Sequence, residues 1–280
     1  MQVCLAGVLT TGNTKRINEM QLYLASGMGS RADLAEELKR GNGDDHTTVD
    51  FSKLKVLESY YYLRSKKQFL PLIAQMKAFL LDSGAFTFLQ HKHNGRIDWD
   101  KYVEEYAKFI NDYDVRLFFE LDIDSLLGIK EVEWLRAKLE RLTGKQPIPV
   151  WHKNRGKEGF LKMCREYPYV ALGGIASKEI PTELYKKAFP WFIRTAHQHG
   201  CKIHGLGFTQ IVELPKYKFD SVDSTAWIYG NIGGYVYKFI PSKGEFEKYF
   251  DKTKRLKTKA VAKHNLQEWI KYSSWAEDNL

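Results

Sequence analysis

Cysteine is scarce in this 280-residue chain, and long hydrophobic runs are missing. Cys4, Cys164 and Cys201 are scattered and odd in number, which argues against a disulfide framework and offers no zinc ribbon. They predict buried free thiols in a reducing cytoplasm. No apolar stretch approaches the roughly 20 residues that a membrane-spanning helix needs. Residues 1–12 have the pattern of a short strand rather than of a signal peptide. We therefore expect a cytoplasmic protein without a membrane partner.

Nucleotide-binding motifs are also missing. The chain contains no dinucleotide fingerprint and no phosphate-binding loop ending in Gly-Lys-Ser/Thr, so no cofactor is expected. Acidic residues are outnumbered, with 34 Asp and Glu against 43 Lys and Arg, which gives a net charge of +9. This excess favours a polyanionic partner such as nucleic acid, through attraction to phosphates and release of counterions. Since many basic proteins bind no polyanion, the charge does not decide the function.

Apolar runs of strand length alternate with amphipathic stretches along most of the chain, which is typical of parallel strands separated by helices. Strands are expected at residues 3–7, 78–82, 117–122, 148–152, 170–172, 202–205 and 219–223, with 235–240 as a further candidate. Helices are expected at residues 100–111, 131–142, 157–167, 181–199 and 211–214. This count favours the α/β class, as a closed (β/α)₈ TIM-barrel-like domain over residues 1–280.

Two segments depart from the alternation. Residues 27–76 are predicted to be an inserted excursion of helix and loop, in which 54–76 has a helical pattern rich in tyrosine. Residues 241–280 are predicted to be a basic helical extension. Its cationic stretch forms either a solvated helix face or a contact to phosphates, and its proposed contact residues are Lys252, Lys254, Arg255, Lys257 and Lys259.

Three aspartates stand at the downstream ends of apolar runs: Asp82, Asp122 and Asp223. In parallel α/β folds the carboxyl ends of the strands converge on one crevice or barrel mouth, where the chemistry collects. Carboxylates delivered there by separate strands predict an active site. Asp220 lies three residues before Asp223 in an extended run, so the two side chains face opposite sides, and we expect Asp223 to point into the mouth.

The segment Asp82-Ser83-Gly84-Ala85-Phe86 combines a strand-end acid, a glycine that permits close backbone approach, and an aromatic ring. An aspartate in a dry crevice can serve as a general acid or base, and Phe86 can stack on a planar base. The alternative is structural: Asp82 or Ser83 caps a helix and Phe86 packs in the core.

Other polar and glycine residues follow the remaining strands. Asp122 and Asp124 are two apart and face alike, so together they are candidates to bind a metal or a polar ligand. His152 is either a binding residue or a structural one. Paired glycines after two strands either touch a ligand with their amides or permit tight turns, and with the adjacent histidine these are Gly173, Gly174, His204 and Gly205.

Taken in order, these segments resemble the motifs of the tRNA-guanine transglycosylases and their relatives, the 7-deazaguanine DNA transglycosylases. Five segments between residues 78 and 226 carry the resemblance: Asp82-Ser83-Gly84-Ala85-Phe86, Phe119-Glu120-Leu121-Asp122, Ala171-Leu172-Gly173-Gly174-Ile175-Ala176, His204-Gly205-Leu206-Gly207 and Phe219-Asp220-Ser221-Val222-Asp223-Ser224. The resemblance implies a nucleophile at Asp223 and a general acid/base at Asp82. It further implies recognition of the base by Asp122 and the glycine loops.

The chain departs from that family in two respects. The family's zinc site needs three cysteines and a histidine after the nucleophile, and no cysteine follows Asp223, so we expect no metal. An arginine-containing segment is replaced by Ser224-Thr225-Ala226-Trp227. These departures favour a compact, phage-borne relative that acts on DNA rather than tRNA.

The resemblance implies replacement of guanine by a 7-deazaguanine such as 7-cyano-7-deazaguanine, through a covalent aspartyl-sugar intermediate. In duplex DNA the target nucleotide must first be extruded from the stack. Two alternatives stay open: a barrel hydrolase or lyase that acts on a small molecule through the same aspartates, and a catalytically silent nucleic-acid-binding module. Pairing with a second copy as a homodimer is also kept open.

Overall fold

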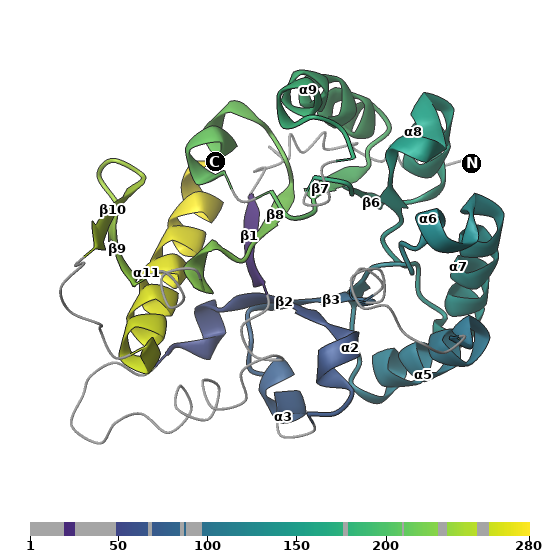
Figure 1. Ribbon diagram of the computed structural model, residues 1–280, viewed down its shortest axis with the longest axis horizontal. Helices are drawn as coiled ribbons and strands as arrows, with labels where there is room; N and C mark the ends of the chain where they lie inside the picture. Colours follow the sequence, from purple (N-terminus) through teal and green to yellow (C-terminus); the bar gives the residue numbers. More distant parts are fainter. Residues whose placement is uncertain are drawn as a thin grey trace, which may run out of the picture.

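Eight parallel strands form the centre of the molecule. The computed structural model describes residues 20–25, 49–66, 69–84, 87, 97–175, 179–208, 210–228, 234–250 and 258–280. The strands are β1 (Gln21–Ala25), β2 (Lys55–Ser59), β3 (Ala78–Asp82), β4 (Leu117–Phe118), β5 (Val150–Trp151), β6 (Tyr169–Leu172), β7 (Lys202–Gly205) and β8 (Ser221–Ser224). Neighbours in sequence pair from β1 to β4 and from β5 to β8, and β1 also pairs with β8 in parallel. Figure 1 shows these strands around the centre with helices outside them.

The ring closes between β4 and β5. Phe119 and Ile148 form a parallel bridge there. The amide of Ile148 donates to the carbonyl of Phe118 at 2.8 Å, and the amide of Glu120 donates to the carbonyl of Ile148 at 3.1 Å. The predicted TIM-barrel-like α/β fold is therefore confirmed.

Helices and short 3₁₀ turns connect the strands. They are η1 (Phe51–Lys53), α2 (Tyr60–Leu63), α3 (Leu70–Ile73), α5 (Trp99–Asp112), α6 (Asp124–Leu127), α7 (Ile129–Thr143), η3 (Lys153–Arg155), α8 (Gly156–Glu166), α9 (Thr182–Gln198) and η4 (Ile211–Lys216). Local chemistry sets several of their ends. The Asp98 carboxylate accepts from the amide of Lys101 as the N-cap of α5. Gly144 ends α7 in the left-handed conformation at φ 67°.

Two apolar layers result from the alternation of side chains along the strands. Tyr23, Leu57, Leu80 and Phe119 belong to a small cluster inside the barrel. The alternate residues of the same strands pack against the surrounding helices in a larger cluster. The inward positions at the strand ends therefore face the barrel mouth, where Asp82 continues the inward row of Leu80.

A C-terminal hairpin and helix follow the barrel. β9 (Tyr235–Ile240) and β10 (Glu245–Phe250) are antiparallel, and α11 (Thr258–Asn279) packs against β9 and β1. The Asn265 and Glu268 side chains of α11 accept from the amides of Tyr237 and Phe239, so the helix covers the outer edge of β9. Within the described residues, no helix is both long enough and apolar enough to span a bilayer.

Several expected elements differ from the structure. The strand expected at 3–7 lies outside the described residues, and β1 is the first strand described. Lys55–Ser59, within the predicted helical excursion at 27–76, is the buried strand β2. The helical prediction was wrong because Lys55 and Glu58 broke the apolar run, yet both are buried in the strand.

The C-terminal region also differs from expectation. Tyr235–Ile240 pairs in the hairpin rather than in the barrel, and Glu245–Phe250 is a strand within the expected helical extension. Cross-strand ring contacts explain the second difference, since Phe246 packs against both Tyr237 and Phe239 of β9.

Candidate active site

The barrel mouth, meaning the C-terminal ends of the barrel strands, brings three carboxylates together. Asp82 ends β3, Asp122 follows β4, and Asp223 lies on β8. Burial raises the pKa of Asp82 to about 8, and the charges of Asp122 and Asp223 push it in the same direction. The structure thus places the three predicted aspartates within electrostatic reach of one another. At neutral pH the Asp82 carboxyl group holds a proton, whereas an exposed aspartate would be ionised.

The loop after Asp82 requires its glycine. Gly84 has φ +80°, and its amide donates to Oδ2 of Asp82 at 3.2 Å. A Cβ atom at Gly84 would lie 2.5 Å from Cβ of Tyr61 and 2.7 Å from Oγ of Ser59. Backbone and side chains therefore approach closely at the mouth, as expected for a glycine beside a site. Ser83 is fully buried, and its carbonyl accepts from the hydroxyl of Tyr102.

Asp223 has one engaged oxygen and one free oxygen. Its Oδ1 accepts from the amide of Gly207 at 2.6 Å and lies 3.1 Å from Nε2 of His204. No described residue hydrogen bonds to Oδ2. Asp220 instead contacts His197 at 2.9 Å and accepts from the amide of Ile203 at 2.8 Å. Asp220 and Asp223 therefore face different parts of the structure, as their spacing of three residues in an extended run predicts.

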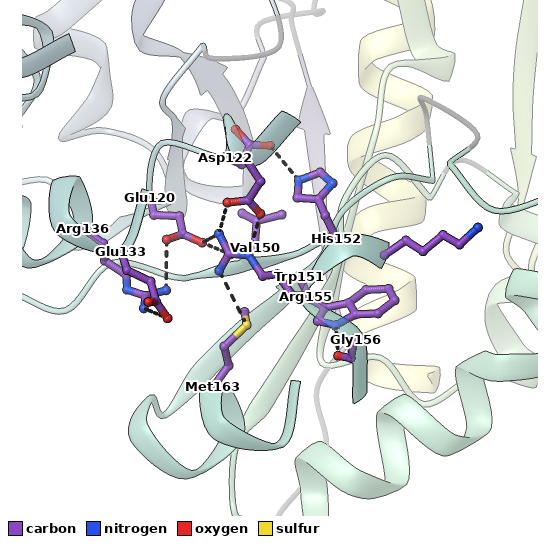
Figure 2. A network of polar contacts seen from close by, with 12 residues as sticks. Glu120, Asp122, Glu133, Arg136, Val150, Trp151, His152, Arg155, Gly156 and Met163 are labelled. Carbon is purple, nitrogen blue, oxygen red and sulfur yellow. Dashed lines mark hydrogen bonds and ion pairs between the residues drawn. The ribbon is translucent and has the colours of Figure 1, made fainter. Parts of the chain in front are cut away.

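His152 lies between two acids at the end of β5. Its Nδ1 is 2.7 Å from Oε1 of Glu179. On the other side Figure 2 shows Asp122, whose Oδ2 is 3.7 Å from Nε2 of His152, too far for a direct hydrogen bond. Burial lowers the pKa of His152, but the interactions with Asp122 and Glu179 outweigh burial and raise the pKa to about 10. His152 is therefore an imidazolium at neutral pH, and both ring nitrogens are donors.

Unpaired buried polar atoms gather at the same place. Oδ1 of Asp122, Nε2 of His152 and Oγ of Ser59 are buried without a hydrogen-bond partner among the described residues. Only one further side-chain atom in the described part of the chain, Nε1 of Trp269, shares this condition. Leaving buried polar groups unpaired costs roughly 1–3 kcal/mol each. Their concentration at the ends of β2, β4 and β5 marks a site shaped for a polar ligand.

Asp124 does not share the position of Asp122. Its carboxylate forms a two-point ion pair with Arg155, with contacts of 2.6 and 2.8 Å. Arg155 also contacts Glu120, which Arg136 approaches at 3.1 Å from the other side (Figure 2). The expectation that Asp122 and Asp124 face alike is therefore wrong. α6 begins at Asp124, so the chain is no longer extended there and the period of two does not hold.

Close packing explains the glycines that follow the strands. A Cβ atom at Gly173 would lie 2.7 Å from Cε1 of His152, and the amide of Gly173 already donates to the carbonyl of Trp151. Gly174 has φ +75° and abuts Glu179. Gly205 is buried in β7. Gly173 and Gly174 thus leave room for the His152–Glu179 pair.

His204 is fully buried and contacts Asp223, so it meets the site through that carboxylate. Phe86, Lys252, Lys254, Arg255 and Lys257 lie outside the described residues. Lys259 belongs to the backbone of α11, but its side chain is not described.

Sequence reasoning missed Ser59, Glu179 and Arg64. Ser59 ends a strand that was assigned to a helix. Glu179 follows the Gly173-Gly174 turn, and its role depends on His152 from another strand. The Arg64 guanidinium lies 5.0 Å from the Tyr61 ring centroid and 5.6 Å from that of Tyr102. The one sequence feature that could have indicated Arg64 was the neighbouring Tyr60-Tyr61-Tyr62 run.

No group of three or more His, Cys, Asp or Glu side chains in the described part of the chain is arranged to hold a metal ion.

Comparisons with known proteins give little beyond this geometry. No family model matches the chain, and no curated protein matches its sequence. Among solved structures, the chain is similar to the carboxyl transferase domain of pyruvate carboxylase from Rhizobium etli, with 12% identity and a TM-score of 0.42. That match covers 74% of this chain and 40% of the other. Function is therefore inferred from the residues at the mouth.

Proposed function

We propose that this chain is a base-exchange transglycosylase that replaces guanine in nucleic acid, with DNA favoured over tRNA, by a 7-deazaguanine. The observation that carries the proposal is the pairing of unlike carboxyl groups at one barrel mouth. Asp82 is protonated at neutral pH, and Asp223 presents one free oxygen. Two carboxyl groups with separate roles are what displacement at a sugar carbon with retained configuration requires.

In this mechanism Asp223 is the nucleophile. Its Oδ2 forms a bond to C1′ as the bond from C1′ to N9 of guanine breaks, and the electron pair of that bond leaves with guanine. Asp82 gives its proton to the departing base and becomes a carboxylate. The incoming 7-deazaguanine then attacks C1′ through N9 and transfers its proton to Asp82. Asp223 departs as a carboxylate, so both groups return to their starting states.

The unpaired atoms at the mouth fit the polar edge of a guanine-like base. Oδ1 of Asp122 is an acceptor, and Nε2 of the charged His152 is a donor. Guanine and 7-deazaguanines carry N–H donors next to a carbonyl oxygen on the same edge, which is the matching pattern. An analogue without that edge would leave buried groups unpaired and be rejected, by a factor of roughly 10⁴ where the match is complete.

Arg64 is our candidate contact to the nucleic-acid backbone at the rim of the mouth. It follows α2, which begins directly after β2, and its guanidinium rests on the rings of Tyr61 and Tyr102. No carboxylate pairs with it among the described residues. A guanidinium held by aromatic rings without an acidic partner is suited to a phosphate. The net charge of +9 acts in the same direction.

The decisive experiment looks for the covalent intermediate and for exchange. The protein is incubated with guanine-containing DNA or tRNA and labelled 7-cyano-7-deazaguanine, and nucleosides are analysed by mass spectrometry. Without the incoming base, a protein–nucleic acid adduct should persist on a denaturing gel. Both signals should vanish in Asp223→Asn and persist in Asp220→Asn, the matched control.

Other outcomes of that experiment would redirect the assignment. Exchange that survives Asp223→Asn would remove Asp223 from its role. Salt-dependent binding of nucleic acid without turnover would favour a silent binding module. Absence of any nucleic-acid binding would instead favour a small-molecule hydrolase or lyase.

A further inference from the structure

Three polar side chains form a line through the barrel interior to Asp223. The hydroxyl of Tyr169 on β6 hydrogen bonds with Oγ of Ser221 on β8, and that oxygen contacts Nδ1 of His204 on β7. Nε2 of His204 lies 3.1 Å from Oδ1 of Asp223. Ser221 and His204 are fully buried. The line therefore connects the interior of the barrel to the proposed nucleophile.

Packing alone does not call for these residues. The rest of the interior cluster is largely apolar, with Leu57, Leu80 and Val150 among its members, and branched apolar residues usually fill the centre of such barrels. Burying a hydroxyl or an imidazole is unfavourable unless each polar atom finds a partner. A line in which every member is paired specifies one arrangement of its side chains, which an apolar interior would not.

Tyr169, at the far end of the line from Asp223, sets the direction of the hydrogen bonds. Burial, followed by the neighbouring Tyr23, raises the pKa of Tyr169 well above its usual value, so the phenol keeps its proton. Its one partner among the described residues is Ser221, to which it donates. The Ser221 hydroxyl then donates to Nδ1 of His204, which leaves the imidazole proton on Nε2. That proton points at Oδ1 of Asp223.

Few ionisable groups act on this imidazole. The rings of Tyr23 on β1 and Phe119 after β4 lie against it, with centroids 6.2 and 5.3 Å away. Burial, followed by the charge of Glu277, raises the pKa of Tyr23 to about 12, so Tyr23 is neutral. Asp223 is the one charged residue that contacts His204 in the described part of the chain. Asp220 acts electrostatically on Tyr169, and Asp82 and Asp223 act on each other.

We propose that His204, oriented by Ser221 and Tyr169, is a positioning residue that engages Oδ1 of Asp223 and directs Oδ2 to the reacting carbon. This role rests on the proposed transglycosylase function. Gly207 supplies a second donor to the same oxygen, so Oδ1 is fully engaged and the carboxylate cannot turn.

Kinetics of three variants test this role. His204→Leu removes the donor, His204→Gln restores one, and Ser221→Ala interrupts the line. We expect kcat to fall by roughly 10²- to 10³-fold in His204→Leu with KM nearly unchanged. His204→Gln should recover most of the rate, and Ser221→Ala should be intermediate. Tyr23→Phe is the matched control, since Tyr23 packs on the same ring without a described hydrogen bond.

A measurement that needs no activity separates this role from the proposed function. Nitrogen-15 NMR of the wild-type protein should show the His204 proton on Nε2. A proton on Nδ1 would overturn the role, as would a folded His204→Leu protein with an unchanged kcat. If the wild type exchanges no base in DNA or tRNA, the proposed function fails. The positioning of Asp223 by His204 would then still be decided by the NMR result.

Discussion

The two ends of the barrel treat carboxyl groups in opposite ways. At the mouth, burial and two neighbouring carboxylates raise the pKa of Asp82 to about 8. At the floor, meaning the N-terminal ends of the strands, Glu277 of α11 meets several donors. Burial would raise its pKa, but hydrogen bonds from Lys55, Lys77 and Gln21 outweigh burial and lower the pKa to about 2. The surroundings, rather than the residue type, set the protonation state.

The two ends of the barrel therefore contribute differently to stability and to the candidate site. Oε2 of Glu277 forms ion pairs with Nζ of Lys55 at 2.8 Å and with Nζ of Lys77 at 2.6 Å. Lys55 is almost completely buried. That cluster ties the C-terminal helix to the starts of β1 and β2. The mouth keeps like charges together and leaves polar atoms unpaired, which opposes folding and prepares a site for a ligand. In barrels of this kind, stability is concentrated at the floor and chemistry at the mouth.

The largest effect is expected at the mouth, from Asp223→Asn. Loss of the proposed nucleophile should reduce the proposed base exchange by about 10⁴-fold or more. The melting temperature should not fall, because the change removes one of three crowded carboxyl groups and so relieves their mutual repulsion. Measured exchange and thermal unfolding of the same preparation check both parts. A parallel loss of activity and stability would contradict the division between the two ends, and Asp220→Asn serves as the control.

Asp82→Asn should lower the rate of the proposed base exchange by roughly 10²- to 10⁴-fold, since the proposed general acid/base is lost. In the wild type, kcat/KM should decline above about pH 8, where Asp82 gives up its proton. The stability of the folded protein should also depend on pH. Because the folded pKa exceeds the usual value of 3.8, the unfolded chain ionises first, and stability falls as pH rises from about 4 to 8.

That decline should reach at most about 1.4 kcal/mol per pH unit and should be absent in Asp82→Asn. Urea unfolding at several pH values measures it. Identical pH dependence in the wild type and the variant would show that Asp82 is not perturbed.

At the floor, Glu277→Gln should lower the free energy of unfolding by about 3 kcal/mol, because Lys55 is left buried without its partner. The activity of the folded fraction should stay unchanged. The folded pKa lies below the usual 4.5, so this stabilisation is present above pH 4.5 and is lost as pH falls toward 2. Urea unfolding gives the value. Asp112→Asn, which breaks an exposed pair with Lys108, should cost no more than about 0.5 kcal/mol.

The smallest effect is expected from Arg64→Ala at the rim. Losing one phosphate contact should weaken binding to all sequences alike and should reduce the salt dependence of log K by about one. Titration of a fluorescent oligonucleotide at several salt concentrations measures the slope. Arg165→Ala, in the last turn of α8 on the floor side, should leave the slope unchanged. Equal slopes in all three proteins would remove Arg64 from the proposed interface.

The barrel was predictable from the sequence because its signals are local. Strands β3 to β8 coincide closely with apolar runs of strand length, and Asp82 and Asp223 were predicted at their ends. β2 was missed because the charged Lys55 interrupts its apolar run. Lys55 can be buried in the strand because it pairs with Glu277, 222 residues away. Asp124 was assigned to the ligand because its neighbour Arg155 comes from another part of the chain. His204 was likewise assigned to the ligand, although it is buried behind Asp223.

By itself the sequence determined the order of strands and helices from β3 to β8 and the acids at the ends of these strands, since side-chain alternation and strand ends are properties of short segments. Only the tertiary structure decided the surroundings of each acid. Burial raises the pKa of Asp82, Asp124 is paired with Arg155, and Asp223 is held by His204 and Gly207. Burial and hydrogen-bond partners differ among the three acids because both depend on residues that meet only when the barrel closes.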